Sequence, residues 1–430
     1  MTRTKDGSAL PVQAAQPHPA GALLPPEREA AKEARTSPHH TSRSLRVAML
    51  TYSFYESDNR VRRYAEALAG RGEAVDVFSL RRQGQGARNE LNGVRIFRIQ
   101  ERVRDEKGKL NYLTRILKFL FRSAAILTRS HLDRPYDLIH VHSVPDFEIF
   151  AAIIPKLTGT RVILDIHDIV PEFYAAKFNV RRRSSIFRLL VWAEKLSVAF
   201  ADHVIISNDL WRRKLCSRSV HPKKCTSMIN YPDETLFSSG TAEPGEHKIV
   251  FLYPGTLNHH QGLDLALLAF NKIKHRIPGA ELQIIGDGPA KPRLARMVTE
   301  LGLEHRVLLQ DPVPLDLIAD KMAGATIGII PKRNDEFGGE AFSTKSLEFM
   351  SLGIPIIISR TRIDQYYFND SLVRFFEPEN VDDLAETMLD MAVNPAKRER
   401  LVMHARAFAQ MNCWGVKKSV YTALVDQLIG

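Results

Sequence analysis

The sequence is poor in cysteine and has no long apolar run. Its three cysteines, Cys216, Cys225 and Cys413, form neither a Cys-x-x-Cys pair nor a Cys/His cluster, which argues against a zinc site and favours a reducing compartment. No stretch reaches the roughly 18 to 20 apolar residues that cross a bilayer. The first residues also lack the pattern of a secretory signal. We therefore expect a cytoplasmic protein, peripheral on the inner face of a membrane if it meets one.

One half of the chain has too few acidic residues to balance its basic ones. Residues 45–235 contain 33 Lys and Arg against 21 Asp and Glu, whereas residues 236–430 contain 21 against 24. The first segment therefore has a net charge of +12 and the second a net charge of −3. This asymmetry predicts that the first half meets an anionic partner, either a membrane surface or a nucleic acid.

The pattern of apolar segments divides the chain into domains. Residues 1–44 contain six prolines and show no helical or strand period, which predicts a disordered tail. Short apolar strands then alternate with amphipathic helices in two successive sets, separated by a polar segment at 232–247. This pattern predicts an α/β fold with two Rossmann-like doubly wound parallel-sheet domains, 45–235 and 236–412, which face a cleft. A last helix within 413–430 can pack back on the N-terminal domain.

Six strands are expected in the first domain and five in the second. Their predicted bounds are 45–52, 75–80, 94–99, 137–143, 160–168 and 202–207, then 248–255, 280–288, 306–310, 325–331 and 354–359. The first helix is expected at 59–72, with Ser57 or Asp58 as its cap.

The most informative segment is EAFSTKSLEFMSLGIP at 340–355. Glu340 precedes a predicted helix or lies in its first turn, and Glu348 lies about two turns along it. The helix start between them is formed by Phe342, Ser343, Thr344 and Lys345. Free backbone N–H groups and the helix dipole attract an anion to such a start, and Lys345 adds positive charge. The residues alone leave an alternative open, in which Glu340 caps the helix and Glu348 faces water.

Several motifs, taken in order, resemble those of family-four glycosyltransferases. EAFSTKSLE fits the Glu-x7-Glu signature of that family, and SLGIPIIIS resembles the helix end and strand that follow it. Counterparts also exist, in the same order, for NRVRRYAEALAGRG, LDIHD, PGTLNHHQGLDLALLAF, GDGP and the helix after Trp414. The resemblance covers roughly residues 45–428. It implies the GT-B fold, a nucleotide-sugar donor bound mainly by the second domain, an acceptor bound by the first, and retention of anomeric configuration.

The resemblance also implies roles for individual residues. Glu348 would accept hydrogen bonds from the ribose hydroxyls, Glu340 would contact the transferred sugar, and His167 would lie near the same sugar. The helix start at 342–345 would receive the departing diphosphate. No cofactor or metal is expected, since no Asp-x-Asp pair at a strand end offers oxygen ligands to a hard cation. The alternative for His167 is a structural histidine under a loop.

Two positions depart from the family pattern. Members often carry an Arg and a Lys in the loop that opens the second domain, and Thr256 and Gln261 occupy these places here. Neither side chain supplies a positive charge, so the phosphates need another partner. The candidates are backbone N–H groups near Gly255 and the side chains of His259, His260, Lys332 and Lys345. Gly286 and Gly288 would let the base approach closely, although a plain turn explains them nearly as well.

Two segments of the basic half combine an apolar row with a basic one. Residues 113–130 contain the basic row Arg115, Lys118, Arg122 and Arg129. Residues 181–192 combine four arginines with Ile186, Phe187, Leu189, Leu190 and Trp192. Such helices fit an anionic membrane surface. The alternative is that their apolar faces pack on the sheet and their arginines are solvated.

The residues after the first strand offer an acceptor site. Asn59 and Arg60 start a helix there and are candidates to recognise a phosphate of the acceptor, although a solvated helix end explains them equally well. His140 and His142 alternate along a strand, and we expect them to face opposite sides and to be structural.

Taken together, the motifs favour a retaining glycosyltransferase that acts on a lipid-linked or polysaccharide-precursor acceptor. One alternative is a GT-B sugar-nucleotide epimerase. The other is a non-catalytic basic protein that binds a membrane or a nucleic acid, although the basic helices have few aromatic residues for stacking on bases. We therefore expect no nucleic-acid partner.

Overall fold

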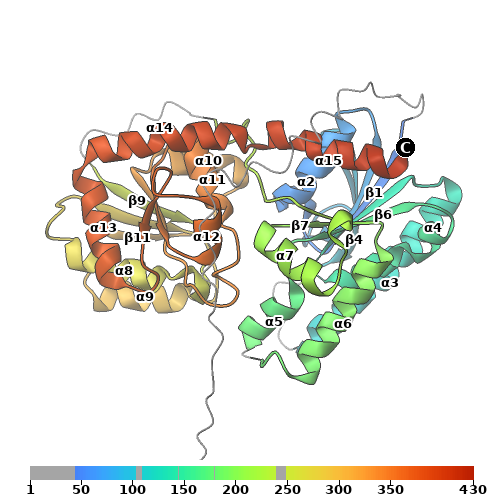
Figure 1. Cartoon of the computed structure of the whole chain (residues 1–430), viewed down its shortest axis with the longest axis horizontal. Helices are drawn as coiled ribbons and strands as arrows, with labels where there is room; N and C mark the ends of the chain where they lie inside the picture. The colour runs from blue at the N-terminus through green and yellow to red at the C-terminus, as the bar shows by residue number, and fades with distance from the viewer. Residues whose placement is uncertain (1–43, 103–108, 144, 179, 239–247) are drawn as a thin grey trace, which may run out of the picture.

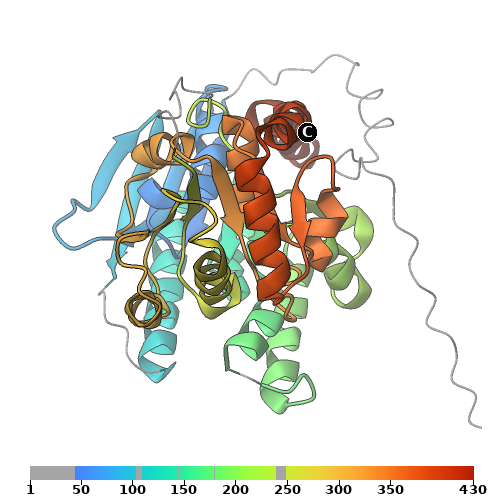
Figure 2. The same cartoon turned by 90° about the vertical axis from the view of Figure 1, so that its left-hand side faces the viewer.

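The computed structural model describes residues 44–430 except 103–108, 144, 179 and 239–247. The expected N-terminal tail therefore lies outside the described residues, apart from Ser44. The described chain forms two α/β domains side by side, each built on one sheet with helices on both faces (Figure 1). Figure 2 looks onto the C-terminal domain with the N-terminal domain behind it. The predicted fold class is confirmed.

The sheet of the N-terminal domain has eight strands within the described residues, in the order β3-β4-β2-β1-β5-β6-β7-β8. Strands β3 and β4 pair antiparallel, and the other neighbouring strands described in this sheet pair parallel. The strands are β1 (Arg46–Thr51), β2 (Ala74–Arg81), β3 (Arg88–Leu91), β4 (Val94–Glu101), β5 (Leu138–Ser143), β6 (Arg161–Ile166), β7 (His203–Ile206) and β8 (Cys225–Ser227). The helices are η1 (Tyr55–Ser57), α2 (Asn59–Ala69), α3 (Lys109–Asp133), η2 (Asp146–Ala152), α4 (Ile153–Leu157), α5 (Val170–Phe178), α6 (Ser185–Phe200), α7 (Asp209–Arg218) and η3 (Pro222–Lys224).

In the described part of the C-terminal domain, the sheet has six parallel strands in the order β11-β10-β9-β12-β13-β14. They are β9 (Val250–Pro254), β10 (Glu281–Ile285), β11 (Val307–Gln310), β12 (Ile327–Ile330), β13 (Ile356–Ser359) and β14 (Arg374–Phe376). The helices are η4 (His259–Gln261), α8 (Leu263–Ile273), α9 (Lys291–Glu300), α10 (Leu315–Ala323), α11 (Thr344–Leu352), α12 (Arg362–Tyr367), α13 (Val381–Val393) and α14 (Pro395–Met411).

Strand β1 shows why these strands read as continuous apolar runs. Its residues Val47 to Leu50 are fully buried, because helices cover both faces of the sheet. Val47 and Met49 pack on the α2 side, whereas Ala48 and Leu50 pack on the side of α3. Each domain thus has two apolar cores, one on each face of its sheet.

The chain returns to the N-terminal domain after α14. Helix α15 (Trp414–Ile429) continues from α14 and lies beside α2 (Figure 1). Its Tyr421 is fully buried, and the hydroxyl lies 3.1 Å from Nδ1 of His140. The two segments that cross between the domains also touch, since the backbone N–H of Trp414 donates to the carbonyl of Pro232 at 2.9 Å.

Three short strands were not predicted, and one prediction about side-chain direction is wrong. Strands β3, β8 and β14 have only three or four residues, and β3 is polar, so none gives an apolar run. His140 and His142 are two residues apart on β5, and their ring centroids lie 4.1 Å apart. They do not face opposite sides, because side chains two positions apart on a strand share a face.

Within the described residues, no helix is both long and apolar enough to cross a bilayer.

Candidate active site

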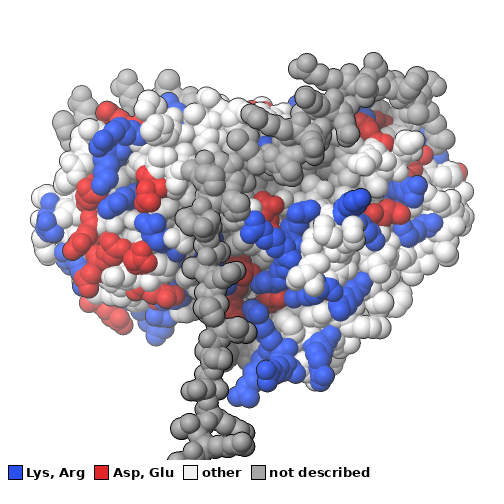
Figure 3. Space-filling view, viewed as in Figure 1, with Lys and Arg blue, Asp and Glu red and all other residues white. Residues whose placement is uncertain are grey.

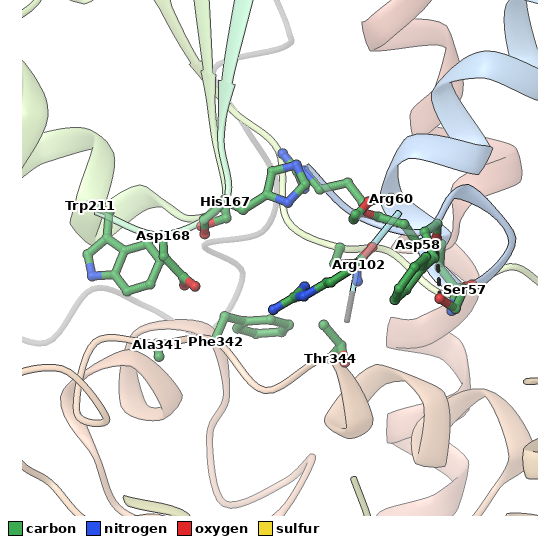
Figure 4. A pocket seen from close by; sticks show the side chains of 15 residues that line it. Ser57, Asp58, Arg60, Arg102, His167, Asp168, Trp211, Ala341, Phe342 and Thr344 are labelled. Atoms are coloured by element: carbon green, nitrogen blue, oxygen red, sulfur yellow. Dashed lines mark hydrogen bonds between the residues drawn. The ribbon is translucent and has the colours of Figure 1, made fainter. Parts of the chain in front are cut away.

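A cavity of about 450 Å³ opens between the two domains, at the carboxyl ends of β1 and β6 where ligands of parallel sheets bind. Figure 4 shows His167, Asp168 and Trp211 on its N-terminal-domain side, with Phe342 and Thr344 facing them from the C-terminal domain. The lining residues are Ser53, Phe54, Ser57, Asp58, Asn59, Arg60, Arg102, His167, Asp168, Ser207, Trp211, Asn230, Ala341, Phe342 and Thr344. The structure thus brings together five predicted site residues: Asn59, Arg60, His167, Phe342 and Thr344.

The start of α2 forms one wall of this cavity. Asp58 caps the helix by accepting a hydrogen bond from the backbone N–H of Val61 at 3.2 Å. Arg60 is buried, and its Nε and Nη2 donate to the two carboxylate oxygens of Asp165 at 2.8 and 2.7 Å. Its Nη1 donates to the carbonyl of Met228 at 2.7 Å. Arg60 is therefore bound within the protein, and its contact with an acceptor stays a prediction, as does that of Asn59.

Asp165 also holds the predicted site histidine. Nε2 of His167 lies 3.0 Å and Nδ1 of His142 3.1 Å from the same Asp165 oxygen, Oδ2. Burial alone would raise the pKa of the Asp165 carboxyl, but Arg60 and His167 outweigh burial and hold this pKa well below its usual range. A buried carboxylate, kept charged by Arg60, therefore orients the His167 ring at the cavity wall.

The lining residues that were not predicted as site residues include Arg102, Asp168, Trp211 and Asn230. Asp168 follows His167 directly in LDIHD, and its place just after β6 was a usable signal. Burial raises the pKa of the Asp168 carboxyl, although His167 and Arg60 oppose the shift. Figure 4 shows the charged ends of Asp168 and Arg102 in the opening. Trp211 lies in the first turn of α7 and belongs to none of the motifs considered, so no signal in the sequence pointed to it.

The C-terminal domain presents the start of α11 to the same region. Ser343 is the N-cap residue, but its side chain does not cap the helix. Its Oγ is buried and has no hydrogen-bond partner among the described residues. Because the first N–H groups of a helix attract anions, this start offers an uncompensated hydroxyl and a positive dipole end to a ligand.

Lys345 reaches back over the loop that follows β9. A Cβ atom at Gly255 would collide with Cε of Lys345 and would lie 3.0 Å from its Nζ. Gly286 packs against Gly255 so closely that a side chain there would collide with the Gly255 carbonyl. Burial lowers the pKa of the Lys345 ammonium, and Glu348 opposes the shift. Lys345 therefore lies against the loop in which the usual clamp residues were expected.

The other residues predicted to bind the donor are either exposed or already bound to other protein groups. Thr256 is exposed, and the Gln261 amide nitrogen lies 3.1 Å from Nε2 of His260. The ammonium of Lys332 is buried, 2.8 Å from Asp364. The N–H of Gly255 donates to the carbonyl of Ile285 at 2.8 Å and is thus not free for a phosphate.

Glu348 lies on α11, half-buried, where it interacts electrostatically with cations of both domains. Burial raises the pKa of its carboxyl, while Lys345 and Arg63 oppose the shift. Burial and Arg60 in turn lower the pKa of Arg63 to about 10. Arg63 belongs to α2, so the Glu348 carboxylate faces a cation of the N-terminal domain across the domain boundary. This agrees with an inward-facing Glu348 and not with a solvated one.

Glu340 does not line the cavity. Its carboxylate pairs with Lys214 of α7, and Oε1 lies 3.3 Å from Nη1 of Arg362. Asn208 Nδ2 also donates to the Glu340 carbonyl at 3.0 Å. Glu340 thus joins the two domains, and its predicted contact with the transferred sugar requires Lys214 to release it.

His140, His142 and Asp165 form a buried group whose ligand atoms lie within 4.8 Å of one another. The Asp165 carboxylate already binds the Arg60 guanidinium through both oxygens. A divalent cation here would lie beside this fixed positive charge, so the group suits a hydrogen-bonded core better than a metal.

Two family models match the chain, one on each domain. Residues 57–228 match the glycosyl transferase 4-like domain, and residues 238–408 match the glycosyl transferases group 1. The matched segments contain every strand of the C-terminal sheet and, apart from β1, every strand of the N-terminal sheet within the described residues. The chain is a glycosyltransferase with the GT-B fold.

Curated relatives and solved structures agree with this class. The chain is 20% identical to alpha-D-kanosaminyltransferase of Streptomyces kanamyceticus, over 75% of this chain and 81% of that protein. It is 22% identical to D-inositol 3-phosphate glycosyltransferase of Thermomonospora curvata, over 85% and 87%. Sucrose-phosphate synthase from Thermosynechococcus elongatus has a similar fold, with a TM-score of 0.73 at 18% identity over 89% and 99% of the two chains. Alr3699/HepE of Anabaena, solved with UDP and glucose, gives 0.67 at 16% identity over 89% and 99%.

Proposed function

We propose that this glycosyltransferase belongs to family four and retains anomeric configuration. It takes a sugar from a nucleotide-diphosphate-sugar donor, bound mainly by the C-terminal domain, and transfers it to a lipid-linked or polysaccharide-precursor acceptor on the N-terminal domain. The observation that carries the proposal is the cavity to which both domains contribute. The Asp165-oriented His167 lies on one side of it, and Phe342 and Thr344 at the start of α11 line the other.

The charges around the cavity suit the cleavage of a glycosyl diphosphate. Breaking the bond between sugar and phosphate leaves an oxocarbenium-like centre and an anionic diphosphate, so charge of both signs must be stabilised. The α11 start and Lys345 supply positive potential for the diphosphate. Asp168 lines the cavity and supplies a carboxyl group on the sugar side. No cofactor or metal takes part in this proposal.

The proposal is tested by assaying hydrolysis and transfer across UDP-, GDP- and ADP-sugars, with the product anomer determined by NMR. We expect Glu348→Ala to weaken nucleotide binding and Glu340→Ala mainly to lower turnover. Equal, negligible effects of both substitutions would refute these roles. An inverted product would refute retention, and absence of nucleotide binding at millimolar concentration would refute the donor class. Product formed without any acceptor would favour the epimerase alternative.

The peripheral location on the cytoplasmic face of a membrane is part of the proposal, and α6 supports it. Ile186, Leu189 and Trp192 of this helix are 47%, 61% and 59% exposed, and the exposed residues Arg181, Arg182 and Arg183 precede it. Figure 3 shows basic side chains gathered on the N-terminal domain on this face of the molecule. Exposed apolar side chains beside arginines fit an anionic lipid surface. In α3, by contrast, Ile116 and Leu127 are buried against the sheet, as in an ordinary amphipathic helix.

A further inference from the structure

The basic row of α3 borders a second cavity. This cavity, of about 550 Å³, lies beside the carboxyl ends of β2 and β4. Its lining residues are Arg81, Ala87, Arg98, Ile99, Gln100, Glu101, Arg115, Lys118 and Arg122. We call it the basic pocket. Its size falls within the range of about 300 to 1,000 Å³ typical of ligand sites.

Positive charge dominates the basic pocket. Of the nine described residues that line it, five are Lys or Arg and one is acidic. Glu101 pairs with Arg81 at 3.0 Å, and Arg98 pairs with Glu56 from outside the lining. Lys118 and Arg122 are exposed and one helical turn apart on α3, so that both can reach the same anion. Among the described residues, Lys118 and Arg122 pair with no acidic side chain, so both cations can serve an anionic ligand.

The basic pocket also contains a buried polar group that suits a ligand. Gln100 is 7% exposed, and its Nε2 donates to the carbonyl of Arg115 at 3.0 Å. Its Oε1 is buried and has no hydrogen-bond partner among the described residues. An unpaired buried acceptor is costly, and a ligand hydroxyl would satisfy it. The combination of cations and one open acceptor suits a phosphate group, whose oxygens bind cations and can also carry a proton.

The chain connects the basic pocket directly to the active-site cavity. Glu101, the last residue of β4, lines the basic pocket, and the next residue, Arg102, lines the cavity between the domains. Arg102 also borders a smaller cavity of about 240 Å³ that includes Asp58, His167 and Asp168. The carboxyl end of β4 therefore contributes consecutive residues to the two cavities, so that one acceptor molecule could contact both.

We propose that the basic pocket binds the phosphate or diphosphate group of the acceptor while the reacting hydroxyl lies near His167. This inference rests on the proposed function, because it concerns the acceptor of that reaction. The inference gives the two basic helices different roles, in which α6 contacts the membrane and α3 recognises the anionic group of the acceptor.

The test compares two variants that change the net charge equally. Lys118→Glu with Arg122→Glu reverses two charges of the pocket, and Arg129→Glu with Arg134→Glu reverses two exposed charges beyond it. The donor site is first saturated with the nucleoside diphosphate that binds best. Inorganic pyrophosphate and farnesyl diphosphate are then titrated calorimetrically, and binding to phosphatidylglycerol vesicles is measured by sedimentation.

We expect the pocket variant to bind both diphosphates at least about tenfold more weakly, because two cations that would face the diphosphate are replaced by carboxylates that repel it. Nucleoside diphosphate binding should be unchanged, which also shows that the variant is folded. The control variant should bind like the wild type. Equal losses in both variants, or a loss of vesicle binding alone in the pocket variant, would overturn the proposal. Binding of pyrophosphate but not of farnesyl diphosphate would overturn the assignment to the acceptor.

Failure of the proposed function gives a different result. If no nucleotide binds to the wild type, but the pocket variant still loses pyrophosphate and farnesyl diphosphate binding, the basic pocket stands as a diphosphate site and the donor assignment fails. If nucleotides bind and the diphosphates bind equally to wild type and pocket variant, the inference fails and the proposed function is unaffected.

Discussion

At the scale of single residues, Asp165 links the fold to the candidate active site. It lies on β6 with an exposure of 0%, and it contacts Arg60 of α2, His142 of β5 and His167 after its own strand. A buried ion pair gains little over apolar packing, but removal of one partner leaves an uncompensated buried charge. Asp165 therefore acts on both stability and the orientation of His167.

We expect Asp165→Asn to lower the free energy of unfolding by about 3 to 5 kcal/mol, because Arg60 stays buried without its counter-ion. Urea unfolding measures this loss. Turnover should also fall, and the donor KM should change little. The fall in turnover should vanish in a His167→Ala background if Asp165 acts through His167. A full additional loss in that background would contradict a positioning role.

A second residue-scale prediction concerns the substituted phosphate clamp. Lys345→Met should weaken binding of a nucleoside diphosphate about tenfold and leave binding of the bare nucleoside unchanged, because only the phosphates face the ammonium. Thr256 is exposed in the loop after β9, against which Lys345 lies, and Thr256→Arg should recover part of the lost affinity. Calorimetric titration checks both changes. Equal weakening of nucleoside and nucleoside diphosphate would show that Lys345 only supports the loop.

The site was predictable where function coincides with a local signal. His167, Phe342 and Thr344 stand at a strand end or a helix start, and all three line the cavity. The contacts that hold them were not predictable. Arg60 and Asp165 are 105 positions apart, and Lys214 and Glu340 are 126 apart, so only the folded chain shows these pairs.

At the scale of elements, the sequence could not distinguish the two basic helices. Both combine apolar and basic rows, and the difference lies in what covers the apolar row. In α3 that row packs toward the sheet, whereas in α6 residues such as Leu189 and Trp192 remain exposed.

Long strands were predictable, because both faces of a strand such as β1 are buried and its sequence is a continuous apolar run. Short edge strands such as β3 were not, since their pairing comes from the neighbour and not from their own residues.

Helix α6 gives the prediction at this scale. We expect Leu189→Ala with Trp192→Ala to reduce binding to phosphatidylglycerol vesicles at least about tenfold, because each buried side chain of this size contributes about 1.5 to 3 kcal/mol. Transfer to a soluble acceptor should be unchanged. Phe121→Ala with Leu132→Ala is the matched control on α3, where Phe121 is 69% exposed and Leu132 is 70% exposed. A larger loss of vesicle binding in the α3 control would contradict the assignment of the membrane surface to α6.

At the scale of the whole molecule, buried ionisable groups set opposing pH trends. Burial raises the pKa of Glu148 to about 8, and neither carboxyl oxygen has a hydrogen-bond partner among the described residues. Burial lowers the pKa of His203 to about 4. The folded state therefore keeps a proton on Glu148 that the unfolded state loses above pH 4.5, and it excludes one from His203 that the unfolded state gains below pH 6.5.

The signs give a paired prediction. The contribution of Glu148 is lost as pH rises from 4.5 to 8, so Glu148→Gln should stabilise the protein more at pH 7.5 than at pH 5. The expected difference is at least about 2 kcal/mol, on a slope of about 1.4 kcal/mol per pH unit. His203→Gln should gain relative stability only below pH 6.5. Urea unfolding at the two pH values checks both, and identical shifts in the two variants would contradict the assignments.

Helix α15 has a consequence for how the protein is made. It completes an apolar core of the N-terminal domain, where Tyr421 and Val425 are fully buried beside α2. During translation, residues 414–429 leave the ribosome only after the entire C-terminal domain. The domain synthesised first must therefore wait with an open apolar groove for a segment made much later. A chaperone that shields this groove would bind nascent chains that still lack α15.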